Sequence, residues 1–245
     1  MNPVLEVRDA VKRYGSKTVV DRVTFSVAEG ELLGVIGPNG AGKTTLFNVI
    51  DGATECDGGS VRLAGVEITG LAPYRRARMG VGRAYQIPRP FTGLSVFENV
   101  LVGAFNLPGA SAASARRRTL GVLDEVGLAD KRDVAAGALP LLDRKRLELA
   151  KAMSVGAKAL LLDEIAGGLT DREVFALVEI VKRLKRGRAV LWIEHIPHAL
   201  KEASDRILVL HFGAKLIEDM PAIVMADPRV HEVYLGISVD DAART

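Results

Sequence analysis

The sequence predicts an α/β fold in which buried strands alternate with helices and one central stretch is mainly helical. Short, continuous apolar runs at residues 32–36 and 159–162 are typical of strands that are buried on both faces of a sheet. A glycine-rich segment connects the first of these runs to a stretch that can continue as a helix. From about residue 87 to residue 155, apolar residues recur instead with helical spacing. We therefore expect a strand-rich core that is interrupted by a helical insertion.

The composition is that of an ordinary globular protein. Of the 245 residues, 48% are hydrophobic and 26% are charged, and the net charge of +3 is too small to indicate a nucleic-acid partner. Cys56 is the single cysteine, which excludes an internal disulfide. No basic start with a following apolar run indicates a signal peptide, and no apolar stretch approaches the roughly 18–20 residues that span a bilayer. We therefore expect a cytoplasmic protein.

Strand patterns dominate the first 86 residues. Alternating or β-branched apolar residues indicate strands, whereas the basic run before residue 80 has helical spacing. The expected elements are strands at 4–7, 19–27 and 32–36, a helix over 45–50, hairpin strands at 60–63 and 66–68, a basic helix at 72–79 and a strand over 80–86 that ends at Gln86.

The remainder of the chain is first helical and then mixed. Charged and apolar residues alternate with helical spacing up to residue 155, after which strand patterns return. The expected elements are helices at 98–104, 112–125 and 144–153, a strand at 159–162, a helix at 171–185, a strand at 189–193, a closing strand pair at 207–210 and 215–217, and one or two short helices within 222–235, interrupted at Pro228. The small, polar residues 238–245 are expected to fray.

Residues 37–44 read Gly-Pro-Asn-Gly-Ala-Gly-Lys-Thr and match the phosphate-loop pattern G-x-x-x-x-G-K-[ST] at every fixed position. The glycines let the backbone curl so that N–H groups point at a phosphate, and the following helix adds its positive dipole end. Lys43 is expected to reach the β- and γ-phosphates, and Thr44 to hold Mg²⁺. The predicted nucleotide-binding residues here are Gly37, Pro38, Asn39, Gly40, Ala41, Gly42, Lys43, Thr44 and Thr45. The segment therefore predicts binding of a nucleoside triphosphate.

Two acids follow the apolar run that ends at Leu162. An acid at the end of a buried strand can lie beside the phosphate loop, so Asp163 is predicted to hold Mg²⁺. Glu164 is predicted to orient and polarise the water that attacks the nucleotide. Together with the phosphate loop, these two acids predict hydrolysis of the bound nucleotide.

With these motifs in place, nearly the whole chain resembles the ATPase subunit of an ABC transporter. Gln86 matches the glutamine of the family's Q-loop, His195 matches its switch histidine, and Tyr14 matches the aromatic residue that stacks on adenine. The resemblance implies that Gln86 contacts Mg²⁺ and water, that His195 touches the γ-phosphate of ATP, and that Tyr14 holds the adenine. It makes Glu164, His195 and Gln86 the expected catalytic residues.

The resemblance also implies an ABC-type P-loop nucleotide-binding domain with a RecA-like core, an antiparallel β subdomain and a helical subdomain. Residues 1–245 then form a single ABC ATPase domain. Its expected parts are the core and β subdomain over 1–86 and 156–236, the helical subdomain over 87–155, and a flexible tail over 237–245.

Finer features resemble the ATPases of branched-chain amino acid importers. They are the stretch from Gln86 to Val100 and the stretch from Val230 to Gly236. The resemblance implies import of branched-chain amino acids or related small polar solutes. The implied partners are a second ABC ATPase subunit in a homodimer or heterodimer, two membrane permease subunits and, indirectly, a solute-binding protein, with no nucleic acid. The chain is then peripheral on the inner face of the cell membrane.

The segment that aligns with the family signature L-S-x-G-Q reads Leu139-Pro140-Leu141-Leu142-Asp143. Proline supplies neither the serine hydroxyl nor an N–H, and leucine replaces a glycine that permits close backbone approach. Asp143 is expected to add negative charge beside the negatively charged ATP. We hypothesise that in a heterodimer this chain gives an intact catalytic half to one nucleotide site and an altered signature to the other. The alternative is that the altered loop still closes over ATP through other donors.

Two functions outside transport also stay open. The first is a nucleotide-binding regulatory module with weak ATPase activity, an alternative to the importer ATPase that the altered signature raises and that Glu164 and His195 argue against. A soluble ABC ATPase that acts on nucleic acid or ribosomes usually has two such domains or long coiled coils. This chain has one such domain and no sustained heptads.

Overall fold

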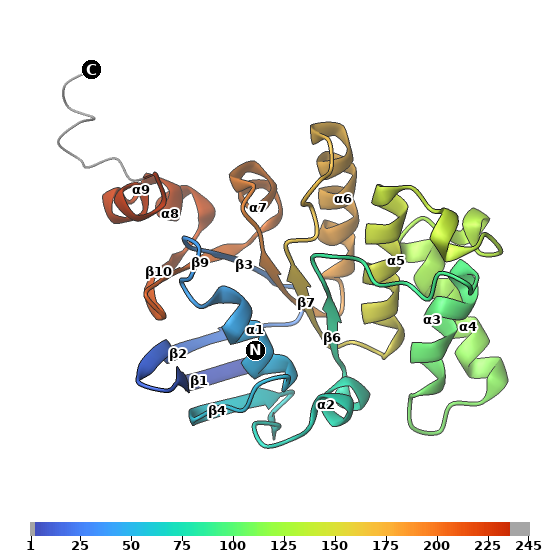
Figure 1. The fold of residues 1–245 in the computed structure, drawn as a ribbon, viewed down its shortest axis with the longest axis horizontal. Coiled ribbons are helices and arrows are strands. Elements are labelled where there is room, and N and C mark those ends of the chain that lie inside the picture. Colours follow the sequence, from blue (N-terminus) through green and yellow to red (C-terminus); the bar gives the residue numbers. More distant parts are fainter. Residues whose placement is uncertain (1–2, 236–245) are drawn as a thin grey trace.

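A six-stranded sheet forms the centre of the fold in the computed structural model, which describes residues 3–235 (Figure 1). The strand order is β10-β9-β3-β8-β7-β6, in which only β10 runs antiparallel to its neighbour. The strands are β3 (Leu32–Ile36), β6 (Val81–Ala84), β7 (Ala159–Asp163), β8 (Ala189–Ile193), β9 (Arg206–His211) and β10 (Ala214–Asp219). Because β3, β8, β7 and β6 are parallel, their carboxyl ends meet at one edge of the sheet.

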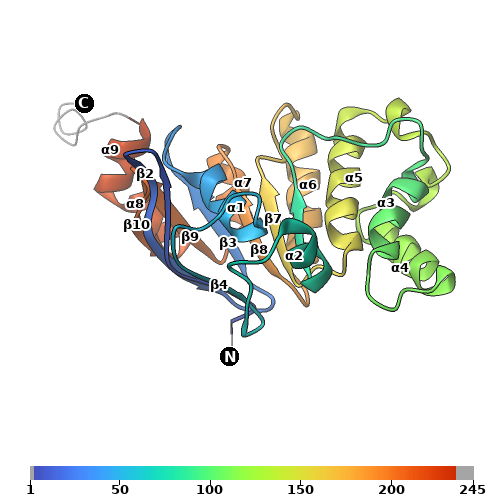
Figure 2. The same ribbon diagram turned by 60° about the horizontal axis from the view of Figure 1, so that its bottom comes forward.

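A second, antiparallel sheet has the order β2-β1-β4-β5. Its strands are β1 (Leu5–Tyr14), β2 (Lys17–Val27), β4 (Gly58–Leu63) and β5 (Val66–Glu67). Helix α1 (Lys43–Asp51) packs between the two sheets (Figure 2), and its buried side chains Leu46, Phe47 and Ile50 share one core with both. The helix that follows the glycine-rich segment is thereby held at the middle of the molecule.

Side chains of the central strands alternate between two cores, as the pleat of a strand requires. Leu161 and Leu191 join the core that contains α1. Leu162 and Trp192, one residue further along their strands, join the core on the opposite face of the sheet. Helices α6 (Asp171–Leu184) and α7 (Pro197–Ala203) contribute to that second core, so the sheet is covered on both faces. The continuous apolar runs of the sequence follow from this double burial.

The remaining helices lie at the two ends of the sheet. Helices α3, α4 and α5 pack on one another at the β6 end, and α8 and α9 lie at the β10 end (Figures 1 and 2). The bounds are α2 (Pro73–Met79), α3 (Val96–Phe105), α4 (Ala112–Glu125), α5 (Leu141–Ser154), α8 (Pro221–Ala226) and α9 (Pro228–Leu235). Among residues 3–235, no helix is both long enough and apolar enough to span a bilayer.

The α/β fold class is confirmed, and most expected elements are present. Two expectations about strands were wrong in extent: β1 runs on to Tyr14, and β6 ends at Ala84, so Gln86 lies in a loop. The irregular pairing of β1 with β2, with a positive φ of 46° at Asp9, hides the alternation that marks a longer strand. Helix α7 was not predicted from the sequence. Pro228 begins α9 and so separates it from α8. The proposed tail over 237–245 lies outside the described residues.

Arg76 on α2 fixes that helix against the end of α1. Its side chain is fully buried, and its guanidinium donates hydrogen bonds to the main-chain carbonyl groups of Val49 and Ile50 at 2.7 and 2.9 Å. The Nε atom donates to the Leu71 carbonyl at 2.8 Å. A buried guanidinium is tolerated here because carbonyl oxygens satisfy its donors.

Candidate functional site

The phosphate-loop residues connect β3 directly to α1. Gly37 follows the last residue of the strand, and Gly42 is the N-cap residue of the helix, so Lys43 and Thr44 begin the first turn of α1. No side chain caps this N-terminus. The first N–H groups of α1 are therefore free of side-chain acceptors, as in a loop that binds phosphate.

Two glycines of this loop are required by space as well as by backbone conformation. A Cβ atom on Gly37 would lie 2.2 Å from the carbonyl oxygen of Leu210, and one on Gly42 would lie 2.4 Å from that of Val19. Gly42 also has a positive φ of 100°. Gly40 differs, because its φ is 80° but no atom lies within 4 Å of an added Cβ. The loop is thus wedged against β2 and β9 at its ends and open at Gly40.

Lys43 points back into the loop. Its ammonium group donates hydrogen bonds to the carbonyl oxygens of Gly37 at 2.7 Å and Pro38 at 3.1 Å. Burial lowers the pKa of this lysine, while the carboxylates of Glu164 and Asp163 act in the opposite direction. The positive charge predicted to meet a phosphate is therefore held within the curl of the loop.

Asp163, the last residue of β7, is bound by an arginine that the sequence reading did not single out. Arg83 on β6 donates from Nη2 to Oδ2 of Asp163 at 2.6 Å, and from Nη1 to Asp51 and Asn48 on α1, each at 2.7 Å. Burial raises the pKa of Asp163, and the Arg83 ion pair opposes that rise. A charged residue inside a short strand of an α/β sheet was the signal that could have revealed Arg83.

Glu164 lies between the two other predicted catalytic residues. Gln86 Nε2 donates to Oε2 of Glu164 at 2.6 Å, and His195 Nε2 lies 2.8 Å from Oε1. The parallel order β8-β7-β6 produces this meeting, because Glu164 follows β7, Gln86 follows β6 and His195 follows β8. Residues that are 78 and 31 positions from Glu164 in the chain are thereby brought to one carboxylate.

The backbone of Glu164 is strained. Its φ of 47° lies in the left-handed region, although glutamate has a Cβ atom. Such a conformation costs on the order of 1–3 kcal/mol and occurs preferentially at functional sites. The main-chain N–H of Glu164 donates to the Ile193 carbonyl at 2.9 Å, which holds the residue at the end of β8.

Tyr14 belongs to the antiparallel sheet and not to the sheet that carries Glu164. It ends β1 at the tip of the β1–β2 hairpin, is 52% exposed, and carries the Lys12 ammonium group 5.5 Å from its ring centroid. An exposed aromatic face is what stacking on a base requires.

The donors predicted for Mg²⁺ fit that ion's usual mode of binding in nucleotide sites. Within the described residues, no cluster of three histidine, cysteine, aspartate or glutamate side chains suits a metal. Mg²⁺ bound with a nucleotide uses one or two protein oxygens and the phosphates rather than an all-protein cage. Asp163 can supply one such oxygen. Arg83 bonds to its Oδ2, and Oδ1 accepts no hydrogen bond from residues 3–235.

Comparison with known proteins identifies the family. A family model described as ABC transporter matches residues 20–167, which span the phosphate loop, Gln86, Asp163 and Glu164. The chain belongs to the ABC transporter family. It is accordingly an ABC-type ATPase, the ATP-binding subunit of a transporter, as the resemblance of the motifs implied.

Relatives of this ABC ATPase match it over nearly the full length. The high-affinity branched-chain amino acid transport ATP-binding protein BraF of Pseudomonas aeruginosa is 36% identical over 96% of this chain and 98% of its own. The lipopolysaccharide export system ATP-binding protein LptB of Acidithiobacillus ferridurans is 35% identical with the same two coverages. A crystal structure of an ATP-binding cassette of an ABC transporter in its ADP conformation superposes with a TM-score of 0.86, at 29% identity over 97% of this chain and 100% of that chain.

The loop that starts at Gln86 is fixed to the helical region by α5. Lys145 donates to the main-chain carbonyl of Gln86 at 2.5 Å, and Glu148 accepts a hydrogen bond from the Arg89 N–H at 2.7 Å. Lys151 donates to the Arg89 carbonyl, also at 2.7 Å. Lys145 and Glu148 are both buried, so these contacts between α5 and the loop are shielded from water.

The signature segment corrects one expectation from the sequence. Asp143 does not project into a nucleotide site: it is buried and paired with Lys131 and with Arg146, the latter at 3.3 Å. Arg144 and Lys145, the two basic residues that follow Asp143, bond to main-chain carbonyl groups. Proline is compatible with this segment because Pro140 is the N-cap residue of α5, where its missing N–H is not needed by the helix.

Glu194 is a buried acid that the sequence reading also passed over. It accepts hydrogen bonds from the Ala166 N–H at 2.7 Å, from the Trp192 indole at 3.2 Å and from the His195 N–H at 3.3 Å. Burial raises its pKa to about 7. Glu194 thereby joins the segment after Glu164 to the segment that carries His195.

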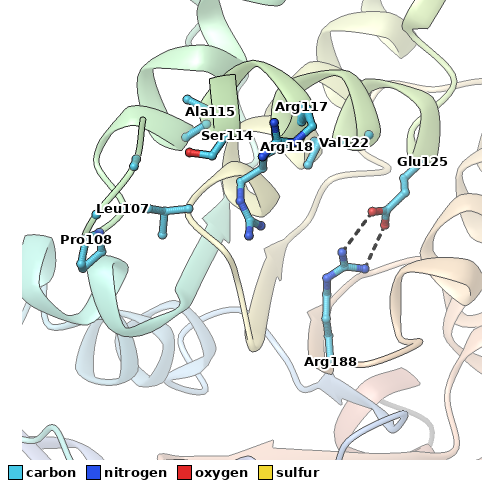
Figure 3. Close-up of a pocket in the computed structure, with 13 residues that line it drawn as sticks. Leu107, Pro108, Ser114, Ala115, Arg117, Arg118, Val122, Glu125 and Arg188 are labelled. Atoms are coloured by element: carbon cyan, nitrogen blue, oxygen red, sulfur yellow. Dashed lines mark hydrogen bonds and ion pairs between the residues drawn. The ribbon is translucent and has the colours of Figure 1, made fainter. Parts of the chain in front are cut away.

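A separate cavity of about 550 Å³ lies in the helical region, between α4 and the loop after α3 (Figure 3). Arg118 points into it, and Glu125 and Arg188 form an ion pair with a 3.0 Å contact at its side. None of the predicted nucleotide-binding or catalytic residues lines this cavity. It is therefore distinct from the nucleotide site.

Alanine at Gly42 is expected to weaken nucleotide binding about tenfold or more, because its Cβ collides with β2 as well as straining the backbone. Gly40→Ala is the matched control, since it brings a comparable positive φ with open space around it. Affinity for a fluorescent ATP analogue and thermal unfolding check both variants. Equal affinities for the two variants would contradict the role given to the contact with Val19.

The pKa of Glu194 predicts how its contribution to stability depends on pH. A folded-state pKa near 7, above the ordinary 4.5, means that the folded protein holds an extra proton between these pH values. Stability from this residue is therefore greatest below about pH 4.5 and is lost as pH rises to about 7. Glu194→Gln removes this loss, so relative to the wild type the variant gains roughly 2.5 kcal/mol in free energy of unfolding between pH 5 and pH 8. Denaturant unfolding at both pH values measures it, and a difference that is independent of pH would refute it.

Proposed function

We propose that this ABC ATPase energises an importer of branched-chain amino acids or related small polar solutes. The observation that carries the catalytic part is the placement of Glu164 between Gln86 and His195, next to Asp163 and the phosphate loop. The importer part is supported by the likeness to BraF over nearly the full length.

In the proposed site, the phosphates of ATP lie on the N–H groups of the phosphate loop and on the N-terminus of α1. Lys43 gives up its hydrogen bonds to the carbonyl oxygens of Gly37 and Pro38 and binds the β- and γ-phosphates instead. Thr45 follows on the same turn of α1, and Tyr14 stacks on the adenine.

Hydrolysis in this site requires a water molecule aligned with the γ-phosphorus. Glu164 accepts a hydrogen bond from this water and polarises it as its oxygen attacks, while the bond between the γ-phosphorus and the bridging oxygen breaks and ADP leaves. His195 and Gln86, which now touch the two oxygens of Glu164, hold that carboxylate in place and meet the γ-phosphate and the water. The strained backbone at Glu164 is consistent with this fixed orientation.

Mg²⁺ is the metal we propose for this site, held by Thr44, Gln86 and Asp163. When bound, it neutralises charge on the β- and γ-phosphate oxygens. Thr44 lies in the first turn of α1 and Asp163 ends β7, and Arg83 bonds to both α1 and Asp163.

The permease subunits are proposed to dock between α2 and α5, next to the loop at 86–94. A cavity of about 420 Å³ lies there, lined by Tyr74, Tyr85 and Arg89 among others. The aromatic and aliphatic side chains of Tyr74, Tyr85, Ile87 and Phe91 are all about half or more exposed. An exposed apolar group of this kind is typical of a protein contact surface.

This chain is proposed to pair with a second ABC ATPase subunit, of the same or a different sequence, so that the dimer encloses two ATP molecules. The altered signature lacks the serine hydroxyl, but the main-chain N–H groups in the first turn of α5 can donate to a phosphate. Pro140 is the N-cap residue of this helix, and no side chain caps these N–H groups. We propose that the site with this chain's own phosphate loop hydrolyses ATP, and that the site with its signature turns over more slowly.

Export is a second candidate function, because the LptB relative of a lipopolysaccharide export system matches the chain as completely as BraF does. The two candidates share the ATPase chemistry and differ in the cargo, which the membrane partners select. A test of the cargo therefore has to use the chain with its natural partners.

For the ATPase chemistry, Glu164→Gln is expected to lower turnover by about 100-fold or more while ATP binding is retained. Glu179→Gln, at an exposed position of α6, is the matched control and is expected to keep wild-type turnover. Steady-state phosphate release is measured over a wide range of protein concentration. Wild-type activity in the Glu164 variant would refute the assignment. Turnover that rises with concentration indicates a homodimer, whereas tight Mg·ATP binding without turnover indicates a partner with an intact signature.

For the cargo, deletion of the gene in its source organism is expected to reduce uptake of radiolabelled leucine several-fold. The wild-type gene is expected to restore uptake, and the gene that carries Glu164→Gln is not, since transport needs hydrolysis. Normal uptake together with a loss of lipopolysaccharide at the cell surface would support export instead.

A further inference from the structure

Arg83 forms a side-chain hydrogen bond and an ion pair with Asp163, one of the predicted metal ligands. Its side chain is 7% exposed and comes from β6, and it lines the cavity between α2 and α5. One Nη group bonds to Asp163 on β7, and the other bonds to Asn48 and Asp51 on α1. A single guanidinium therefore connects three elements of the nucleotide site.

The two residues of α1 that bond to Arg83 lie on the same face of the helix as Thr44, another predicted metal ligand. Thr44, Asn48 and Asp51 are spaced four and three residues apart, which puts them on one face of the helix. Arg83 holds the C-terminal end of this face at Asn48 and Asp51, and Thr44 begins it. The helix that carries Thr44 is thus tied through Arg83 to the strand that carries Asp163.

The hydrogen bond from Arg83 leaves one carboxylate oxygen of Asp163 free to bind a metal ion. Arg83 takes Oδ2 at 2.6 Å, which fixes the rotation of the carboxylate and directs Oδ1 away from the arginine. The rings of Tyr85 and Phe47 lie 4.8 and 5.8 Å from the guanidinium carbon, so the arginine itself is held in a fixed plane. Ligands held in this way by an outer hydrogen bond bind metal more tightly than free ones.

We propose that Arg83 is a positioning residue of the ATPase reaction, which sets the separation between Thr44 and Asp163 and so the affinity for the nucleotide-bound metal. The bridge needs both Nη groups, since one nitrogen alone cannot bond to Asp163 and to α1 in this arrangement. The proposal rests on the metal site of the proposed function and adds to it a residue that does not touch ATP.

The test measures Mn²⁺ affinity in the presence of saturating ADP, by electron paramagnetic resonance of the free ion, and ADP affinity in EDTA. Arg83→Met is expected to weaken Mn²⁺ binding about tenfold and to change metal-free ADP binding less than about twofold. Arg76→Met is the matched control, because it also removes a buried guanidinium that contacts α1 but has no contact with Asp163. It is expected to lower the unfolding midpoint while leaving Mn²⁺ affinity unchanged.

Arg83→Lys keeps the charge and serves as the second variant if methionine prevents folding. It is expected to weaken Mn²⁺ binding to a similar extent, because lysine cannot form the two-sided bridge. Wild-type Mn²⁺ affinity in either folded variant, or an equal loss in Arg76→Met, would overturn the proposal.

Thr44→Ala separates this proposal from the function on which it rests. If Thr44→Ala weakens Mn²⁺ binding and the Arg83 variants do not, only the role of Arg83 is refuted. If the wild type binds Mn²⁺ no better with ADP than without it, the proposed metal site itself is refuted.

Discussion

Parallel pairing of β3, β8, β7 and β6 is the constraint on which the nucleotide site depends. In this order every strand ends at the same edge, and each delivers one functional segment there. β3 leads into the phosphate loop, β7 ends in Asp163 and Glu164 follows it, and β6 and β8 are followed by Gln86 and His195. Burial of the strands on both faces stabilises this order, so the core of the fold and the position of the catalytic side chains have one cause.

Charge is arranged around this edge so that each buried ionic group has a partner. Lys43 bonds to carbonyl oxygens of the loop, Arg83 pairs with Asp51 and Asp163, and Glu194 accepts three N–H groups. An unpaired charge in any of these places would cost several kcal/mol. These pairs also connect elements: Arg83 lines the cavity between α2 and α5 and at the same time holds Asp163. A polar network thus runs from a surface groove to the predicted metal ligand.

The helical region is coupled to the same edge through main-chain contacts. Lys145, Glu148 and Lys151 of α5 bind the carbonyl and N–H groups of the loop at Gln86 and Arg89. The altered signature forms the start of the same helix: Pro140 is its N-cap residue, and Asp143 in its first turn is paired with Lys131. A side chain that looked unfavourable for ATP therefore has a structural role inside the helical region.

The sequence by itself determined the α/β class, the phosphate loop, the two acids after β7 and the family, because each depends on a local pattern with a fixed spacing. It also indicated Gln86, His195 and Tyr14 through the resemblance, although their contacts were beyond its reach. Only the tertiary structure decided that Glu164 bonds to both Gln86 and His195, that Arg83 bridges Asp163 to α1, and that Asp143 is paired inward. These contacts join residues from different strands and helices, and a local pattern holds no information about which distant side chain completes a buried ion pair or hydrogen bond.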